Sequence, residues 1–193
     1  MSNSITYSRD LSFMKSDKYF KPIWCIIGGG NGGHAVSGHL ALMGFEVRIY
    51  DIFAETVDTI QKQGGIYVEG DVNGFGKISF ATADLGKAVK GADIVMIVAP
   101  ALAHKKIASD CAPFLEDGQT VVIHPGATCG ALEFVHTLKQ QNCKADVTVA
   151  ETNSLIYACR LEKPGHVNIF GIKNTLLVAA LPSSKNKEVT ALL

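Results

Sequence analysis

The chain has 193 residues, of which 47% are apolar and 19% charged, and 18 basic residues balance 18 acidic ones. These values are typical of a globular domain with a substantial core. The balanced charge, without a basic block, argues against nucleic acid and anionic membranes as partners. No apolar run reaches the ~18 residues that a membrane-spanning helix needs.

The five cysteines are dispersed along the chain and form no C-x-x-C pair. This usage favours reduced thiols and a cytoplasmic protein. The cysteines and histidines also lack the spacing of a zinc site, so no metal site is predicted. Residues 1–21 are polar and contain no apolar signal-peptide segment, and they are expected to be a flexible leader.

The first predicted element is a short buried strand over residues 23–27, followed by a glycine-rich turn and a helix. Gly28, Gly30 and Gly33 have the G-x-G-x-x-G spacing of a dinucleotide-binding turn. Gly28 allows a sharp turn, Gly30 allows the backbone to approach a pyrophosphate, and Gly33 allows the helix to pack on the strand.

The backbone N–H groups around Asn31 and Gly32 are expected to face the phosphates, aided by the positive end of the helix dipole. The alternative is a glycine-rich turn that binds no ligand. The following helix contains His39, for which a packed or solvent-facing position is favoured over a catalytic one.

The second predicted strand covers residues 46–51 and ends at Asp51, about twenty residues beyond the glycines. A carboxylate there accepts hydrogen bonds from both adenosine ribose hydroxyls of NAD and repels the 2′-phosphate of NADP. Residues 52–54 include no cation to bind that phosphate, and Arg48 is expected on the opposite strand face. NAD is therefore favoured over NADP, although Asp51 also suits the role of a helix cap.

The next segment predicts a helix over residues 55–63 and a hairpin within 66–80 that turns at Asn73-Gly74. A short helix over 85–90 follows, and Asp84 is its expected cap.

Residues 92–100 form the strongest strand pattern, apolar on both faces as in a central parallel strand. In a doubly wound sheet this strand lies beside the first one, so Ala99 and Pro100 should lie near the middle of the dinucleotide. His104 begins the next helix and either contacts cofactor or substrate, or faces solvent.

A fifth strand is predicted over residues 120–123, followed by a loop and a helix with an apolar stripe at Leu132, Val135 and Leu138. A sixth strand over 146–150 ends next to Glu151, which is a candidate cofactor-binding residue at the ligand side of the sheet.

Residues 167–170 and 175–181 are expected to form a terminal hairpin. The predicted fold is thus α/β, a Rossmann-type doubly wound parallel sheet with a terminal antiparallel hairpin, over residues 22–182. Residues 183–193 are expected to begin a linker or the first helix of a missing second, helical domain. The helical pattern continues to the last residue without a cap, which predicts a longer protein.

Four stretches together suggest a family: IGGGNGGHA at 27–35, VAPALAH at 98–104, HPGATCGALEF at 124–134 and ETNSLIYACR at 151–160. In these stretches the chain resembles the amino-terminal domain of the octopine/nopaline (opine) dehydrogenases. Members of that family often carry Asn and Arg where this chain has His124 and Ala127.

The resemblance implies an NAD(P)H-binding domain joined to a helical substrate domain. Such enzymes condense an α-keto acid with an amino acid and transfer hydride from the nicotinamide to an imine carbon. The proton-handling histidine belongs to the second domain, so no catalytic residue is assigned and the chain alone is expected to be inactive. The candidate cofactor-binding residues are Gly28, Gly30, Asn31, Gly32, Gly33, Asp51, Ala99, Pro100, His104 and Glu151.

Two other functions stay open. One is the cofactor domain of a ketopantoate-reductase-like or glycerol-3-phosphate-dehydrogenase-like enzyme. The other is a non-catalytic NAD-binding sensor module. Apolar surface near residues 176–181 would be exposed without a second domain, which makes a homodimer a candidate assembly.

Overall fold

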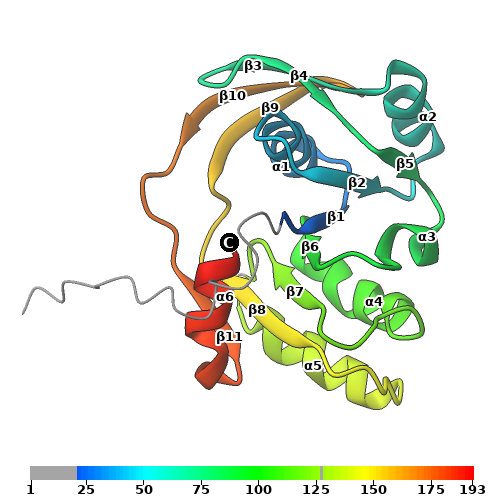
Figure 1. Cartoon of the computed structure of the whole chain (residues 1–193), viewed down its shortest axis with the longest axis vertical. Helices are drawn as coiled ribbons and strands as arrows, with labels where there is room; N and C mark the ends of the chain where they lie inside the picture. Colours follow the sequence, from blue (N-terminus) through cyan, green and yellow to red (C-terminus); the bar gives the residue numbers. More distant parts are fainter. Residues whose placement is uncertain (1–20, 127) are drawn as a thin grey trace, which may run out of the picture.

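The computed structural model describes residues 21–126 and 128–193, so the leader predicted over 1–21 lies almost entirely outside the described residues. The described residues form two β-sheets and six α-helices (Figure 1).

The main sheet has seven strands and carries the predicted parallel core. In space the order is β11-β8-β7-β6-β1-β2-β5, and all neighbours are parallel except β8 and β11. Strand β6, which has the strongest strand pattern in the sequence, lies directly beside β1. This confirms the central position predicted for it. The bounds are β1 (Ile23–Ile27), β2 (Glu46–Tyr50), β5 (Phe80–Thr82), β6 (Ile94–Ile97), β7 (Thr120–Ile123), β8 (Thr148–Thr152) and β11 (Val178–Leu181).

A second, four-stranded sheet corrects two sequence predictions. Its order is β4-β3-β10-β9, with bounds β3 (Gly65–Gly70), β4 (Gly74–Lys77), β9 (Tyr157–Lys163) and β10 (His166–Ile172). Residues 167–170 and 175–181 do not pair with each other, because β10 pairs with β9 and β3 while β11 joins the main sheet. The predicted turn at Asn73-Gly74 does join antiparallel strands, β3 and β4, but Phe80 lies in the main sheet beside β2.

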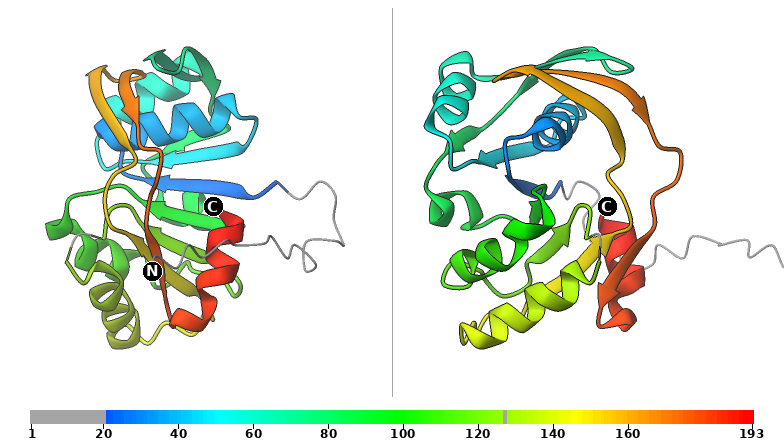
Figure 2. Two further views of the ribbon diagram at one scale, coloured as in Figure 1. Left: turned by 90° about the vertical axis from the view of Figure 1, so that its left-hand side faces the viewer. Right: turned by 180° about the vertical axis from the view of Figure 1, so that it is seen from behind.

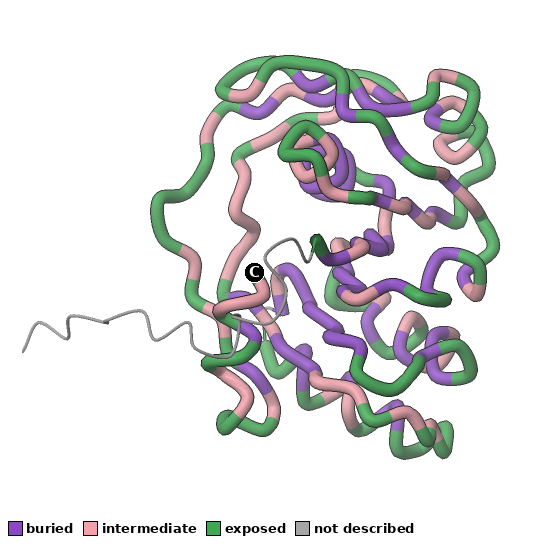
Figure 3. Tube along the Cα trace, viewed as in Figure 1, coloured by how far each residue is buried: buried purple, intermediate pink, exposed green. Residues whose placement is uncertain are grey.

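Helices cover both faces of the main sheet (Figure 2). They are α1 (Asn31–Leu42), α2 (Ala54–Gln63), α3 (Leu85–Val89), α4 (Ala101–Cys111), α5 (Gly130–Gln140) and α6 (Asn186–Leu192), with a 3-10 turn at Ser183–Lys185. Alternate residues of β1 face opposite layers: Cys25 and Ile27 pack with α3, α4 and α5, whereas Trp24 and Ile26 pack with α1 and the small sheet. The buried residues follow these central strands (Figure 3).

Helix α1 lies between the main sheet and the small sheet (Figure 1), and residues 32–38 are all buried. Close contact requires glycines on both sides. A Cβ on Gly76 of β4 would collide with the Gly38 carbonyl oxygen of α1, and a Cβ on Gly38 would press on Val68 of β3. The small sheet is thereby packed directly against the backbone of the glycine-rich helix.

The helix α5 stripe differs from the predicted one by one residue. Leu138 is buried and Val135 packs partly buried against the core, as predicted. Leu132 is 55% exposed, so its predicted core position is wrong, and Ala131 and Phe134 face the core at the same helical spacing from Leu138.

The structure confirms the predicted cap of α3 and the helical pattern near the end of the sequence. Asp84 caps α3 by accepting a 3.1 Å hydrogen bond from the Lys87 N–H. At the other end of the chain, α6 packs Val189 against Ala150 and Ala180 of the main sheet. Among the described residues, no helix is long and apolar enough to span a membrane.

The contact between α1 and the small sheet predicts a strong effect of Gly76→Ala. The methyl group has to displace backbone atoms of Gly38, so we expect the free energy of unfolding to fall by about 1–3 kcal/mol in urea denaturation. Gly171→Ala in β10 is the matched control, because the nearest atom to its added Cβ lies 4.0 Å away. Equal stability losses in the two variants would contradict the packing argument.

Candidate functional site

The glycine-rich turn joins β1 to α1 through two close backbone contacts. Gly28 has a φ of +113°, and a Cβ there would collide with the Val98 carbonyl oxygen beyond β6. A Cβ on Gly33 would collide with the Gly28 carbonyl oxygen. These contacts confirm the geometric roles predicted for the two glycines, and they hold the start of α1 against the edge of the sheet.

The N-terminus of α1 points into this turn. Gly30 is its N-cap, and the first turn contains no acidic residue. The first N–H groups of a helix have no acceptor within the helix, so they are available to an anion. The Asn31 side chain is used elsewhere, because its Oδ1 accepts a 2.9 Å hydrogen bond from the Leu161 N–H. Leu155 lies over Gly32.

Asp51 lies directly after β2, 8% exposed, beside the glycine-rich turn. Its carboxylate accepts hydrogen bonds from the Gly29 N–H and, at 2.8 Å, from the Phe53 N–H. The N-cap of α2 is Phe53, so Asp51 acts next to the helix start and not as the predicted cap. Arg48 bonds to the Lys90 carbonyl oxygen at 2.6 Å, away from Asp51.

A cavity of about 390 Å³ opens between this turn, the end of β2 and helix α4. It brings together five of the ten predicted cofactor-binding residues. These are Gly28, Gly30, Asp51, Ala99 and Pro100. The cavity lining does not include Asn31, Gly32, Gly33, His104 or Glu151.

Sequence reasoning missed several residues that line this cavity. Phe53 and Leu102 are apolar but 66% and 99% exposed, so they offer apolar contact area to a ligand. Lys106 also lines the cavity, and its Nζ lies 2.8 Å from an oxygen of Asp110. The sequence did contain a signal for these residues, because residues 102, 106 and 110 are spaced four apart and therefore share one face of α4.

His104 lies between this cavity and a second one. It is 3% exposed, so its predicted solvent-facing alternative is wrong. Its Nε2 lies 3.0 Å from the Ala99 carbonyl oxygen, and because a carbonyl oxygen only accepts, Nε2 is the donor of this hydrogen bond. His104 lines the second cavity, of about 400 Å³, with Cys129, Glu133 and His136.

Glu151 holds the loop that follows β7. Its Oε2 accepts a 2.7 Å hydrogen bond from the Ala131 N–H in the first turn of α5. A Cβ on Gly126 would collide with the Glu151 side chain, so the loop packs against it. The carboxylate thus caps α5 and packs against Gly126.

Two buried histidines hold backbone segments around the site. His34 Nδ1 lies 3.2 Å from the Gly30 carbonyl oxygen, and its Nε2 accepts a 3.0 Å hydrogen bond from the Gly165 N–H. A carbonyl only accepts and an N–H only donates, so the ring is neutral with its proton on Nδ1. Burial lowers the His34 pKa. This histidine joins the glycine-rich turn to the β9–β10 hairpin.

His124 is bonded in the same way. Its Nε2 accepts from the Ile156 N–H at 3.3 Å, and its Nδ1 lies 2.7 Å from Thr152 Oγ1. The Thr152 hydroxyl donates to the Ser154 carbonyl oxygen, so it accepts from His124. Burial, and then the charge of Lys173, lower the His124 pKa to about 4. Both nitrogens are engaged, and the ring is held neutral.

Comparison with known proteins identifies a matching family and several similar dehydrogenases. Residues 24–150 match the family described as NAD-dependent glycerol-3-phosphate dehydrogenase N-terminus. The chain is 42% identical over 163 residues to the opine dehydrogenase of Arthrobacter sp. (strain 1C), an alignment covering 84% of this chain and 45% of that protein.

Solved structures share the fold. An octopine dehydrogenase in complex with NADH and agmatine has a TM-score of 0.73 and 28% identity, over 83% of this chain and 42% of that one. A PanE/ApbA family ketopantoate reductase from Ralstonia eutropha JMP134 has a TM-score of 0.67 and 25% identity, over 88% and 53%. The chain spans less than half of its opine and octopine dehydrogenase relatives.

The lowered pKa of His124 predicts acid destabilisation. His124 takes up its proton near pH 6.5 in the unfolded chain but only near pH 4 in the folded chain. The contribution of neutral His124 to the free energy of unfolding is therefore complete above pH 6.5 and is lost as the pH falls toward 4. The loss should be on the order of 2–3 kcal/mol in urea denaturation. His124→Asn, which keeps a hydrogen-bond donor near Thr152, should make the free energy of unfolding less dependent on pH in this range. His136→Asn, at an exposed histidine, should leave it unchanged, and equal slopes in both variants would refute the assignment.

Proposed function

Because the chain belongs to the family of NAD-dependent glycerol-3-phosphate dehydrogenase amino-terminal domains, and is the NAD-binding domain of an opine-type dehydrogenase, we propose that the whole protein reductively condenses an α-keto acid with an amino acid. In this reaction the keto carbonyl and the amino group form an imine and release water. Hydride from NADH then reduces the imine carbon, and a proton reaches the nitrogen, giving a secondary amine and NAD⁺.

The observation that carries the cofactor part is the buried Asp51 carboxylate beside the glycine-rich turn. We assign the adenosine half of NADH to the 390 Å³ cavity, with the ribose hydroxyls at Asp51 and the adenine against Phe53 and Leu102. A 2′-phosphate would meet the Asp51 charge, and Lys106, the lysine in the lining, is already paired with Asp110. This arrangement supports NAD over NADP.

The pyrophosphate is assigned to the N-terminus of α1, where Gly30 and the N–H groups of residues 31–33 meet it through the backbone. Ala99 and Pro100 then lie along the middle of the dinucleotide, at the carboxyl edge of β6, beside β1. His104 and Glu151 act at the nicotinamide end. His104 offers its Nδ1 there, while Glu151 acts through the loop that it holds.

The proton-handling group is assigned to the second domain of the whole protein, to which residues 183–193, packed on the main sheet through Val189, would lead. The bonding of two buried histidines of this domain supports that assignment. His34 and His124 use both ring nitrogens in backbone and hydroxyl hydrogen bonds, so neither has a free nitrogen for proton transfer. The chain alone would then bind NADH without turning over.

The proposal also covers the cellular compartment and the oligomeric state of the protein. All five cysteines are free thiols, which supports a reducing compartment such as the cytoplasm. Leu177 is 64% exposed next to β11, and this apolar surface would favour self-association of the chain as a homodimer.

The cofactor assignment predicts that the chain binds NADH more tightly than NADPH. Asp51→Asn removes the charge but keeps an acceptor oxygen. It should weaken NADH binding by about tenfold and reduce the ratio of the NADH affinity to the NADPH affinity. Nicotinamide fluorescence measures both titrations. Asp58→Asn, at an exposed carboxylate of α2, is the control and should change neither affinity. An unaltered cofactor preference in Asp51→Asn would remove Asp51 from the site.

The reaction assignment predicts NADH oxidation by the whole protein only when an α-keto acid and an amino acid are both present. The octopine dehydrogenase relatives were solved with NADH and agmatine, L-arginine or pyruvate, which makes pyruvate with L-arginine the first pair to test. Residues 1–193 alone should give no turnover. Oxidation of NADH by a keto acid alone would favour the ketopantoate-reductase-like alternative, and oxidation by glycerone phosphate alone would favour the glycerol-3-phosphate one.

A further inference from the structure

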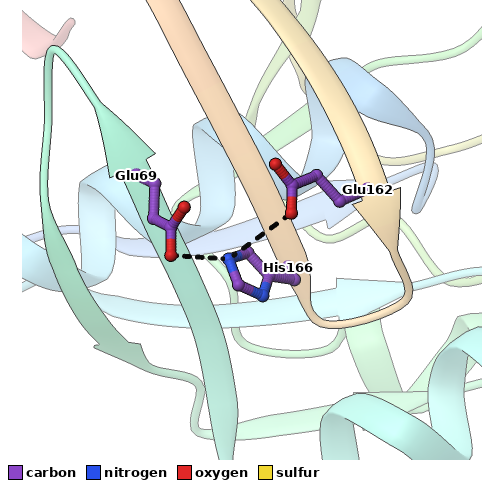
Figure 4. A group of neighbouring side chains, drawn as sticks. All are labelled: Glu69, Glu162 and His166. Atoms are coloured by element: carbon purple, nitrogen blue, oxygen red, sulfur yellow. Dashed lines mark ion pairs between the residues drawn. The ribbon is translucent and has the colours of Figure 1, made fainter.

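The outer face of the small sheet carries a cluster of three side chains that the cofactor site does not use. Glu69 lies on β3, Glu162 on β9 and His166 on β10, and the three side chains point toward one another (Figure 4). Along β10 the buried Val167 and Ile169 face α1, so His166 faces the opposite side, away from the core. The cluster therefore lies across three neighbouring strands of the small sheet, and none of its residues lines the dinucleotide cavity.

The distances within the cluster fit the coordination sphere of a small divalent ion. His166 Nε2 lies 3.1 Å from Glu69 Oε1 and 3.9 Å from Glu162 Oε2. One nitrogen and two carboxylate oxygens lie within 4.8 Å of one another. In a tetrahedral site with bonds of about 2.0–2.2 Å, ligand atoms lie roughly 3.4 Å apart. The two measured distances bracket that value, and small rotations of two exposed glutamates would equalise them.

The charges of the cluster are also unbalanced without an ion. In the described part of the chain, the ion pairs of Glu69 and Glu162 are both with His166, and no lysine or arginine pairs with either carboxylate. His166 Nε2 is a buried atom, yet no contact to it has the geometry of a hydrogen bond. The ring is oriented by Tyr67, whose centroid lies 5.8 Å away. A ring nitrogen is thus held facing two carboxylates, and no lysine or arginine of the described residues pairs with them.

We propose that Glu69, Glu162 and His166 bind a divalent transition-metal ion of the Zn²⁺ class. An imidazole nitrogen with two carboxylates suits zinc and its neighbours, whereas Ca²⁺ and Mg²⁺ prefer sites built from oxygen alone. Three protein ligands leave a fourth position for water at the exposed side of the cluster.

The ion joins three strands of the small sheet at the β9–β10 hairpin. The same hairpin presents the Gly165 N–H to His34, which in turn bonds the Gly30 carbonyl of the glycine-rich turn. The site is therefore a structural clip for the sheet that packs on α1. Because its ligands come from positions 69, 162 and 166, the local spacing of a short metal motif does not reveal it.

The test is calorimetric titration of the purified chain with ZnCl₂. The exposed Cys129 thiol is replaced in every variant by Cys129→Ser, because a free thiolate binds zinc by itself. We expect one zinc per chain, and a melting temperature that rises by several degrees at saturating zinc. Glu69→Gln, Glu162→Gln and His166→Gln should each lower the zinc affinity by about tenfold or more. MgCl₂ should produce no comparable shift.

Glu46→Gln is the matched control, since Glu46 is a carboxylate of similar exposure that pairs with Arg48 on the main sheet. It should bind zinc like the parent. The glutamate substitutions are at the surface and their folding is checked by circular dichroism. Unchanged zinc affinity in folded Glu162→Gln and His166→Gln would overturn the site. Absence of zinc binding by the parent up to about 1 mM would leave only a histidine–carboxylate ion pair and would equally overturn it.

Discussion

The structure depends on how closely helix α1 approaches the backbone on its two sides. At its start, Gly33 packs on the Gly28 carbonyl oxygen, and in its middle Gly38 packs on Gly76 of the small sheet. Neither contact leaves space for a side chain. The first contact aims the helix N-terminus at the edge of the main sheet, where its N–H groups and the helix dipole are available to an anion. The second fastens a sheet of distant segments onto the same helix.

Asp51 shows how a single carboxylate serves both the fold and the site. Its two oxygens accept hydrogen bonds from Gly29 and Phe53, so the glycine-rich turn and the segment after β2 are held together at one point. The carboxylate thereby lies in the cavity wall. The order of the sheet produces this meeting, because β2 pairs directly with β1 and both strands end at the same edge.

The sequence by itself determined the local elements and the kind of cofactor. The apolar run at β6 indicated a central parallel strand, and the glycine spacing with Asp51 indicated a dinucleotide that lacks a 2′-phosphate. These signals are local, since each depends on residues that are close in the chain or on one strand. They also included the signal at Asp84, whose capping bond is formed within three residues.

Only the tertiary structure decided which distant segments meet. It separated residues 167–170 from 175–181 and paired β10 with β3 instead, a parallel contact across about a hundred residues that periodicity cannot reveal. It also decided the chemistry of the histidines. Burial and hydrogen bonds to both ring nitrogens hold His34 and His124 neutral, while His166 meets two carboxylates from other strands. Protonation and ligation depend on what surrounds a ring in space, and folding alone brings those neighbours together.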